Sequence, residues 1–174
     1  PDCQGPANPS CRLDHFAGLN ALARDPAGNI AYVYAGSRQP QDGELIFLVT
    51  SSDGGATWTD PRRLSPPRAG DRRVIAVFPA IASGGVGDFR LVYMDNRMGA
   101  KSWNNWYRST TDGGATWTTD VLLSDATGGA GYIHPGGFDA DYGDYQGVAV
   151  MDNGKTIATW GAGYSYWGPG GTWI

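Results

Sequence analysis

The chain has 174 residues, 41% of them hydrophobic, which is the length of one domain with a sizeable core. It contains 27 Gly and 11 Pro, or 38 together, and this share stays below that of low-complexity chains. The formal net charge of −4 offers no basic surface for nucleic acid, and no apolar run approaches the about 20 residues of a membrane helix. We therefore expect a folded, turn-rich domain with no nucleic-acid partner and no membrane span.

The N-terminal stretch contains the two cysteines of the chain, Cys3 and Cys11, among Pro and Gly residues. Their spacing permits a small disulfide loop, which implies an oxidising compartment and so a secreted or extracytoplasmic protein. Two free thiols are the alternative. No signal segment precedes Pro1, so we expect a mature chain or one cut from a longer polypeptide.

A seven-residue run is repeated without change. Asp53 to Thr59 recurs as Asp112 to Thr118, and the same offset of 59 matches Arg38 with Arg97. A third, incomplete copy aligns 145–149 with 78–82 and 19–23. A whole unit is therefore repeated.

Each unit consists of four short alternating segments broken by turn residues, which is typical of a four-stranded antiparallel sheet. Glu and Lys are scarce, and this composition also favours strands over helices. The sequence predicts an all-β fold of about two and a half β-propeller blades. We expect a Cys-containing N-terminal loop over 1–14, blades over 15–66 and 67–125, and an incomplete blade over 126–174.

The repeated motif has the chemistry of a hairpin clamp. Its Asp can accept backbone N–H bonds across the turn, its glycines tolerate positive φ, and a Ser or Thr two positions earlier can brace the Asp. Its Trp can bury against the adjoining strand. We therefore expect a structural role for Ser51, Asp53, Gly55, Trp58, Thr110, Asp112, Gly114 and Trp117.

These motifs resemble the Asp box, or bacterial neuraminidase repeat, of sialidase-like β-propellers. The resemblance covers nearly all the chain from about His15, and it implies six or more blades with the Asp boxes on the face opposite the active site. Propellers close with 4 to 8 blades, so two and a half blades do not form a ring. The remaining blades would come from the same protein or from another chain.

The long connections between strands are predicted to gather on one face. In an antiparallel meander, the turns after the first and third strands share one end, and the other loops share the opposite end. The loops at that opposite end are long and rich in Arg, Asp, Trp and Tyr, so we expect the ligand there. Among their aromatic residues, Trp103 and Trp167 are candidates for stacking on sugar rings.

The resemblance also implies catalytic residues. Sialidases use a Tyr that opens such an inner strand as their nucleophile, and Tyr145 matches that position. A phenol needs a nearby base, and Asp144 is a candidate acid or base beside it. Tyr145 as an aromatic core residue is the alternative. Glu44 is the only glutamate of the chain, and its distance along the chain makes it a poor candidate for that base.

Two further groups of residues carry predicted ligand contacts. By the resemblance, Arg38 and Arg97 would hold a substrate carboxylate, although Arg97 could equally brace its own loop through Asp95. Asp139 and Asp141 have the oxygen ligands that suit Ca²⁺, with solvated carboxylates as the alternative. No cofactor is otherwise required.

The sequence thus predicts a secreted, sialidase-like glycoside hydrolase, or a fragment of one, that acts on terminal sugars of glycans or glycoproteins. Two alternatives remain open at this level. The chain could be a non-catalytic propeller that binds a glycan or a protein through the same loops. It could also be a structural blade segment of a larger assembly.

Overall fold

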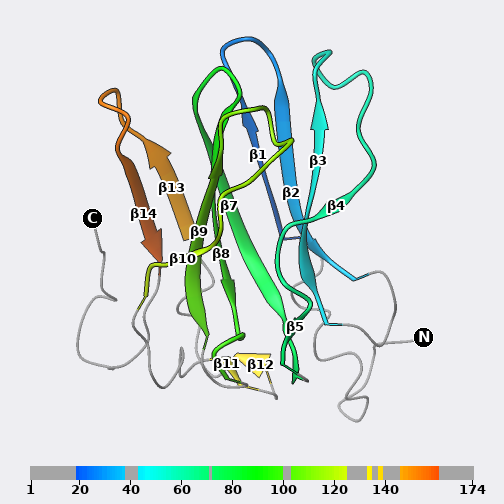
Figure 1. Cartoon of the computed structure of the whole chain (residues 1–174), viewed down its shortest axis with the longest axis vertical. Helices are drawn as coiled ribbons and strands as arrows, with labels where there is room; N and C mark the ends of the chain where they lie inside the picture. The colour runs from blue at the N-terminus through cyan, green and yellow to red at the C-terminus, as the bar shows by residue number, and fades with distance from the viewer. Residues whose placement is uncertain are drawn as a thin grey trace.

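The computed structural model describes residues 19–37, 43–70, 72–99, 103–124, 133–134, 137–138 and 146–160, and over these residues the chain is all-β (Figure 1). The strands are β1 (Asn20–Arg24), β2 (Ile30–Gly36), β3 (Leu45–Ser51), β4 (Arg62–Arg63), β5 (Arg68–Ala69), β6 (Arg72–Arg73), β7 (Ala76–Gly85), β8 (Asp88–Asp95), β9 (Asn104–Thr110), β10 (Val121–Leu122), β11 (Ile133–His134), β12 (Gly137–Phe138), β13 (Gln146–Val150) and β14 (Thr156–Trp160). In this described part, no helix is long and apolar enough to cross a bilayer.

The two complete repeats fold into sheets of the same topology. The first sheet has the strand order β1-β2-β3-β4, the second has β7-β8-β9-β10, and neighbouring strands are antiparallel in both. A third sheet pairs β13 with β14. The predicted four-stranded antiparallel blades are therefore confirmed. The predicted segment limits at residues 14, 66 and 125 stay predictions.

The sheets stand side by side with their first strands together (Figure 1). β7 contacts β1 on one side and β13 on the other. The main core lies between the first two sheets, where alternate residues of β2 meet the second sheet. Ala31 and Val33 are fully buried on one side of this core, and Phe89 and Leu91 on the other. This is the arrangement of neighbouring propeller blades.

The turns and loops separate to two ends of the sheets, as predicted. The β1–β2, β7–β8 and β13–β14 turns lie at the upper end in Figure 1, together with the β3–β4 and β9–β10 connections that contain the repeated motif. The β5–β6 and β11–β12 hairpins lie at the lower end. We call these the motif end and the loop end.

Candidate functional site

At the motif end, the first repeated motif forms a closed set of hydrogen bonds. The Ser51 hydroxyl donates to Asp53 Oδ1 over 2.7 Å and accepts from the Gly55 N–H over 2.8 Å. The Thr57 N–H donates to Asp53 Oδ1 over 2.9 Å, and the Thr57 hydroxyl donates to Oδ2 over 2.6 Å. These are the bonds expected of a hairpin clamp. Those donated by Thr57 and Ser51 lower the pKa of Asp53 to about 2.

The second motif has the same bonds. Thr110 donates its hydroxyl to Asp112 Oδ1 over 2.6 Å, and Thr116 donates its N–H to the same oxygen over 2.9 Å. The pKa of Asp112 lies well below its usual value because of the hydrogen bonds from Thr110 and Thr116. Gly114 has φ +97°, a backbone conformation that favours glycine. A Cβ there would also lie 3.2 Å from the Leu48 side chain of the first sheet, which is a tight contact.

The two motif tryptophans differ in burial. Trp117 packs partly buried against the core between the first two sheets, whereas Trp58 is 44% exposed. The prediction that the motif Trp buries against a strand is therefore wrong for Trp58. Its ring meets Tyr32 edge-on, at 6.4 Å between centroids, on the side of the first sheet away from the second. The same side carries Phe47, which stacks on Tyr34 and is 4% exposed.

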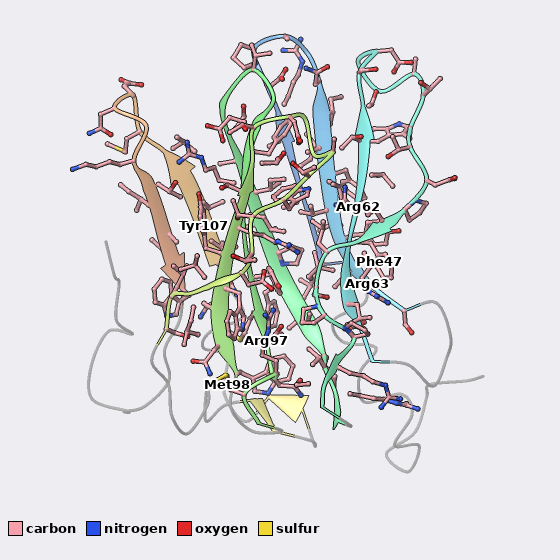
Figure 2. All side chains as sticks on the ribbon, viewed as in Figure 1. Phe47, Arg62, Arg63, Arg97, Met98 and Tyr107 are labelled. Atoms are coloured by element: carbon pink, nitrogen blue, oxygen red, sulfur yellow. The ribbon has the colours of Figure 1, made fainter. Side chains whose placement is uncertain are left out.

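Toward the loop end, Arg97 lies over the second sheet and is held by charged neighbours (Figure 2). Its Nε donates to Asp95 Oδ2 over 2.8 Å, and its other guanidinium nitrogens donate to Asp120 over 2.7 Å and to the Tyr93 hydroxyl over 2.6 Å. The guanidinium carbon lies 3.8 Å from the centre of the Trp106 ring. The contact with Asp95 is the local brace that the sequence left as an alternative to substrate binding.

The groups in this cluster shift one another's protonation. Burial raises the pKa of Asp95, although the hydrogen bonds from Arg97 act in the opposite direction. Burial also raises the pKa of Tyr93, and the negative charge of Asp120 adds to this. Tyr93 therefore stays a neutral phenol. Its hydroxyl donates a hydrogen bond to Asp120 Oδ1 over 2.9 Å.

Trp103 and Trp106, which flank the start of β9, are both buried. Trp103 is 5% exposed and Trp106 is 8% exposed. The expectation of Trp103 as an exposed stacking platform is thus wrong. The strand register explains the burial of Trp106. This residue lies opposite Tyr93 on the face of the second sheet that packs against the first.

Glu44, the glutamate that the sequence made a poor candidate for the base, is buried. It lies at the loop end directly before β3 and is 6% exposed. Its backbone oxygen accepts a hydrogen bond from the Ala76 N–H over 2.8 Å, at the start of the innermost strand of the next sheet. The offset of 59 aligns Glu44 with Trp103, which directly precedes the equivalent strand of the second sheet.

Two amide side chains near the loop end have buried polar atoms without a hydrogen-bond partner. They are Gln146, through both its oxygen and its nitrogen, and Asn105, through its oxygen. Gln146 opens β13 and Asn105 is the second residue of β9. A buried polar atom without a partner costs about 1–3 kcal/mol, so water or a polar ligand at these atoms would be stabilising.

The innermost strand of the second sheet is irregular at the same end. Phe78 has φ +54°, and the β7–β8 register shifts between Val77 and Ala80. A bulky residue in this left-handed region is strained, and such strain concentrates at functional sites. Phe78 is the repeat equivalent of Tyr145.

The remaining predicted site residues lie outside the described residues: Cys3, Cys11, Arg38, Asp139, Asp141, Asp144, Tyr145 and Trp167. Their roles stay predictions. Among the residues that are described, no three His, Cys, Asp or Glu side chains are grouped to hold a metal ion.

A groove of about 480 Å³ opens at the motif end between the first two sheets. Its lining includes Thr57, Thr59 and Asp112, whose polar atoms already bond within their own turns. We therefore place the candidate site at the loop end, where buried polar groups remain unsatisfied.

Comparisons with known proteins bear on the fold. Neither protein-family models nor curated protein sequences match the chain. Among solved structures, it is similar to the GH93 α-L-arabinofuranosidase of Fusarium graminearum in complex with arabinobiose, with a TM-score of 0.57 and 18% identity over 88% of this chain and 43% of that one.

Two further structures are similar. A Penicillium chrysogenum α-L-arabinanase complexed with arabinobiose has a TM-score of 0.54 and 17% identity over 82% of this chain and 40% of that one. A Hadza microbial sialidase has a TM-score of 0.57 and 13% identity over 83% and 32%. The chain thus spans less than half the length of each. The described sheets are blades of a β-propeller, the fold that the chain shares with these three glycoside hydrolases.

Proposed function

We propose that the chain is part of a β-propeller glycoside hydrolase that releases terminal sugars from glycans or glycoproteins, with the sugar bound at the loop end. The observation that carries this proposal is the likeness of fold, over 82% or more of the chain, to three glycoside hydrolases, two of them in complex with arabinobiose. The paired motifs support it further through their resemblance to the Asp boxes of sialidase-like propellers.

The polar groups at the loop end suit a sugar. The amide of Gln146 can donate and accept, and Asn105 Oδ1 can accept, which complements sugar hydroxyls that do both. Glu44 adds a carboxylate at the same end, beside the start of β7.

The proposed chemistry uses a nucleophile and carboxylates. Tyr145 attacks the anomeric carbon as a carboxylate takes its phenolic proton, and the bond to the leaving oxygen breaks as an acid protonates that oxygen. Water then displaces Tyr145 from the sugar and restores the phenol. Asp144 and Glu44 are the candidates for the proton-transferring carboxylates.

The charge of the terminal sugar is a separate question. Arg97 already contacts Asp95 and Asp120, so its positive charge is balanced within the chain. An anionic sugar such as sialic acid would therefore depend on other cations, among them Arg38. The described residues favour an uncharged terminal sugar, such as the arabinose unit seen with two of the similar structures.

The test is hydrolysis of fluorogenic α-L-arabinofuranosides and sialosides by the purified protein and three variants. If Tyr145 and Glu44 act in the reaction, Tyr145→Phe and Glu44→Gln each lower kcat about 10²-fold or more without unfolding the protein. Tyr32→Phe, on the outer side of the first sheet, is the matched control and keeps the wild-type rate. Unchanged rates in both site variants would contradict the roles proposed for these residues.

Glycan binding without catalysis is the second candidate function. It is favoured by the brace around Arg97 and the burial of Trp103, which remove two predicted substrate contacts from the surface. Binding to a glycan array with no turnover of any bound glycan would establish it in place of hydrolysis.

We also propose an extracytoplasmic location with a Cys3–Cys11 disulfide, and calcium at Asp139 and Asp141 as an optional ligand. Intact mass should rise by two hydrogen masses on reduction if the disulfide is present. A melting temperature that falls with a chelator and recovers with Ca²⁺ would support the metal site.

A further inference from the structure

The turn between β13 and β14 contains the one Asn-Gly pair of the sequence, Asn153 and Gly154. Residues 151–155 are all exposed. The Gly154 N–H donates to Met151 O over 2.8 Å, which closes the turn, and Gly154 has φ +78°. The Lys155 N–H donates to Asn153 Oδ1 over 3.1 Å. This bond draws the side-chain carbonyl of Asn153 toward the backbone that follows it.

This arrangement suits an attack by the backbone on the side chain. A bond between the Gly154 nitrogen and Asn153 Cγ closes a five-membered ring, and glycine has no Cβ to hinder its formation. Negative charge develops on Oδ1 during such an attack, and the Lys155 N–H already points at that atom. The turn thus brings together an electrophile, a nucleophile and a donor for the developing charge.

The exposure of this position does not depend on which sheets stand beside it. In the second sheet, Val86 precedes the turn glycine Gly87 as Asn153 precedes Gly154. Val86 is 66% exposed although β7 contacts the sheets on both sides. The same position in the first sheet, Ala27, is exposed as well. A further neighbouring sheet would therefore leave Asn153 in contact with water.

The Asp-Gly pairs of the two motif turns are protected from the same chemistry. Asp53 and Asp112 each accept hydrogen bonds from two neighbouring residues, which favour the ionised carboxylate. A carboxylate ion is a poor electrophile, because its charge opposes the incoming nitrogen. Asn153 instead carries a neutral amide with ammonia as the leaving group, so it is the more reactive side chain.

We propose that Asn153 is a site of spontaneous deamidation, and that the reaction loosens the third sheet from the second. The Gly154 nitrogen loses its proton to hydroxide and bonds to Asn153 Cγ, and ammonia leaves with a proton taken from water. The resulting cyclic imide adds one water at either of its carbonyls. Ring opening then gives aspartate or isoaspartate at position 153, so the net reaction converts an amide and water to a carboxylate and ammonium.

The backbone oxygen next to this site ties the two sheets together. Arg90 on β8 donates to Gly154 O over 3.0 Å and to the Thr156 hydroxyl over 2.7 Å. Isoaspartate adds one methylene to the main chain directly before Gly154, so it moves the oxygen that Arg90 contacts. The inner hairpin of the third sheet should therefore open more often after the reaction. This inference does not depend on the proposed hydrolytic function.

The first sheet provides a matched turn for the test. Its Gly28 N–H closes the turn on Asp25 O over 3.0 Å, in the same way as in the third sheet. The Asn29 N–H takes the place of the Lys155 N–H, but it already donates to Asp25 Oδ1 over 2.8 Å. Ala27→Asn thus creates an Asn-Gly pair in the same kind of turn without the donor to the side-chain oxygen.

The test incubates the folded wild type, Ala27→Asn and Asn153→Ala in mildly alkaline buffer. Peptide mapping by mass spectrometry follows deamidation at each position, and isoaspartyl methyltransferase labels the isoaspartate. In Ala27→Asn, position 153 should react about tenfold faster than position 27. Equal rates at the two positions would overturn the proposal. An unreacted Asn153 in the folded chain, under conditions in which the urea-unfolded chain reacts, would overturn it as well.

Hydrogen exchange tests the effect on the sheets. The amides of β13 and β14 should exchange about threefold or more faster in the deamidated chain than in fresh protein, and Arg90→Ala should produce the same gain without deamidation. Asn153→Ala, incubated in the same way, is the control and should keep the exchange of its fresh form. Unchanged exchange in the deamidated chain would contradict the loosening of the third sheet. Circular dichroism confirms folding of each variant before these comparisons.

Discussion

At the scale of single residues, the two Asp-box turns show how one carboxylate can organise a loop. Asp53 and Asp112 each accept both a backbone N–H and a hydroxyl from the Thr four positions later. These bonds favour the ionised form, so the pKa of each carboxyl is lower in the folded chain than in the unfolded one. The clamps are therefore coupled to pH.

This coupling predicts an acid-sensitive stability. A carboxyl with a depressed folded pKa stabilises the fold above its unfolded pKa of about 4, and the contribution is lost as pH falls through its folded pKa. For Asp53, the loss runs from about pH 4 to about pH 2. Urea denaturation across this range should show a shallower pH dependence for Asp53→Asn than for the wild type. An equal slope for both proteins would contradict the clamp's role.

The identical motifs also provide a matched pair of tryptophans. Trp117 packs on the core and Trp58 is 44% exposed, so their replacement should differ in cost. We expect Trp117→Ala to lower the free energy of unfolding by about 3 kcal/mol and Trp58→Ala by about 1 kcal/mol. Chemical denaturation of the monomeric chain measures both. Equal losses would show that the sheet neighbouring Trp117 adds nothing to its packing.

At the scale of elements, the blades are tied by polar contacts as well as by the core. Arg62 on β4 donates to the backbone oxygens of Gly114 and Ala115 in the second motif turn. Arg90 on β8 donates to Gly154 O over 3.0 Å and to the Thr156 hydroxyl over 2.7 Å in the third sheet. The first and second blades thus each place an arginine on a turn or hairpin of the next blade.

The neighbouring arginines on β4 allow a controlled test of such a tie (Figure 2). Arg62→Ala removes the bonds to the second sheet and should cost about 1–2 kcal/mol of unfolding free energy. Arg63→Ala, one residue along and also exposed, should change stability by no more than about 0.5 kcal/mol. A loss in Arg63→Ala as large as in Arg62→Ala would mean that general charge, rather than the inter-sheet bonds, sets the effect.

At the scale of the whole molecule, the three sheets differ in how well they are covered. The second sheet lies between its two neighbours, and β8 is almost wholly buried. The third sheet has one described pair of strands, and Ala149 and Thr159 on it are exposed. Stability is therefore expected to fall from the second sheet to the third.

Amide hydrogen exchange can measure this gradient. In dilute protein, the amides of β13 and β14 should exchange about tenfold or more faster than those of β8 and β9. Uniform protection of the four strands would contradict the gradient.

Much of the fold was open to prediction because a seven-residue motif recurs without change within a repeated unit. The offset of 59 located two sheets of equal topology, and strand alternation placed the motif turns and the long loops at opposite ends. The hydrogen bonds of the motif could be predicted from its own residues, because a carboxylate, a hydroxyl and two glycines lie within seven positions. Their contacts need no residue from elsewhere in the chain.

The candidate site was less predictable, because its contacts join distant positions. Arg97 is bound by Asp120, 23 residues later, as well as by its neighbour Asp95. Nothing in the sequence indicated the first contact. Trp103 looked like a loop residue available to a ligand, but it is buried.

The sequence by itself determined the blade, its clamp and the end of the sheets at which the loops gather, since these follow from local alternation and turn chemistry. Only the tertiary structure decided that Trp58 is exposed while Trp117 packs against the core, although seven consecutive residues around them are identical. The physical reason is that burial depends on the neighbouring sheet. The second sheet has the first beside it on the side of Trp117, whereas no contact of three or more residue pairs joins the first sheet to any described sheet other than the second.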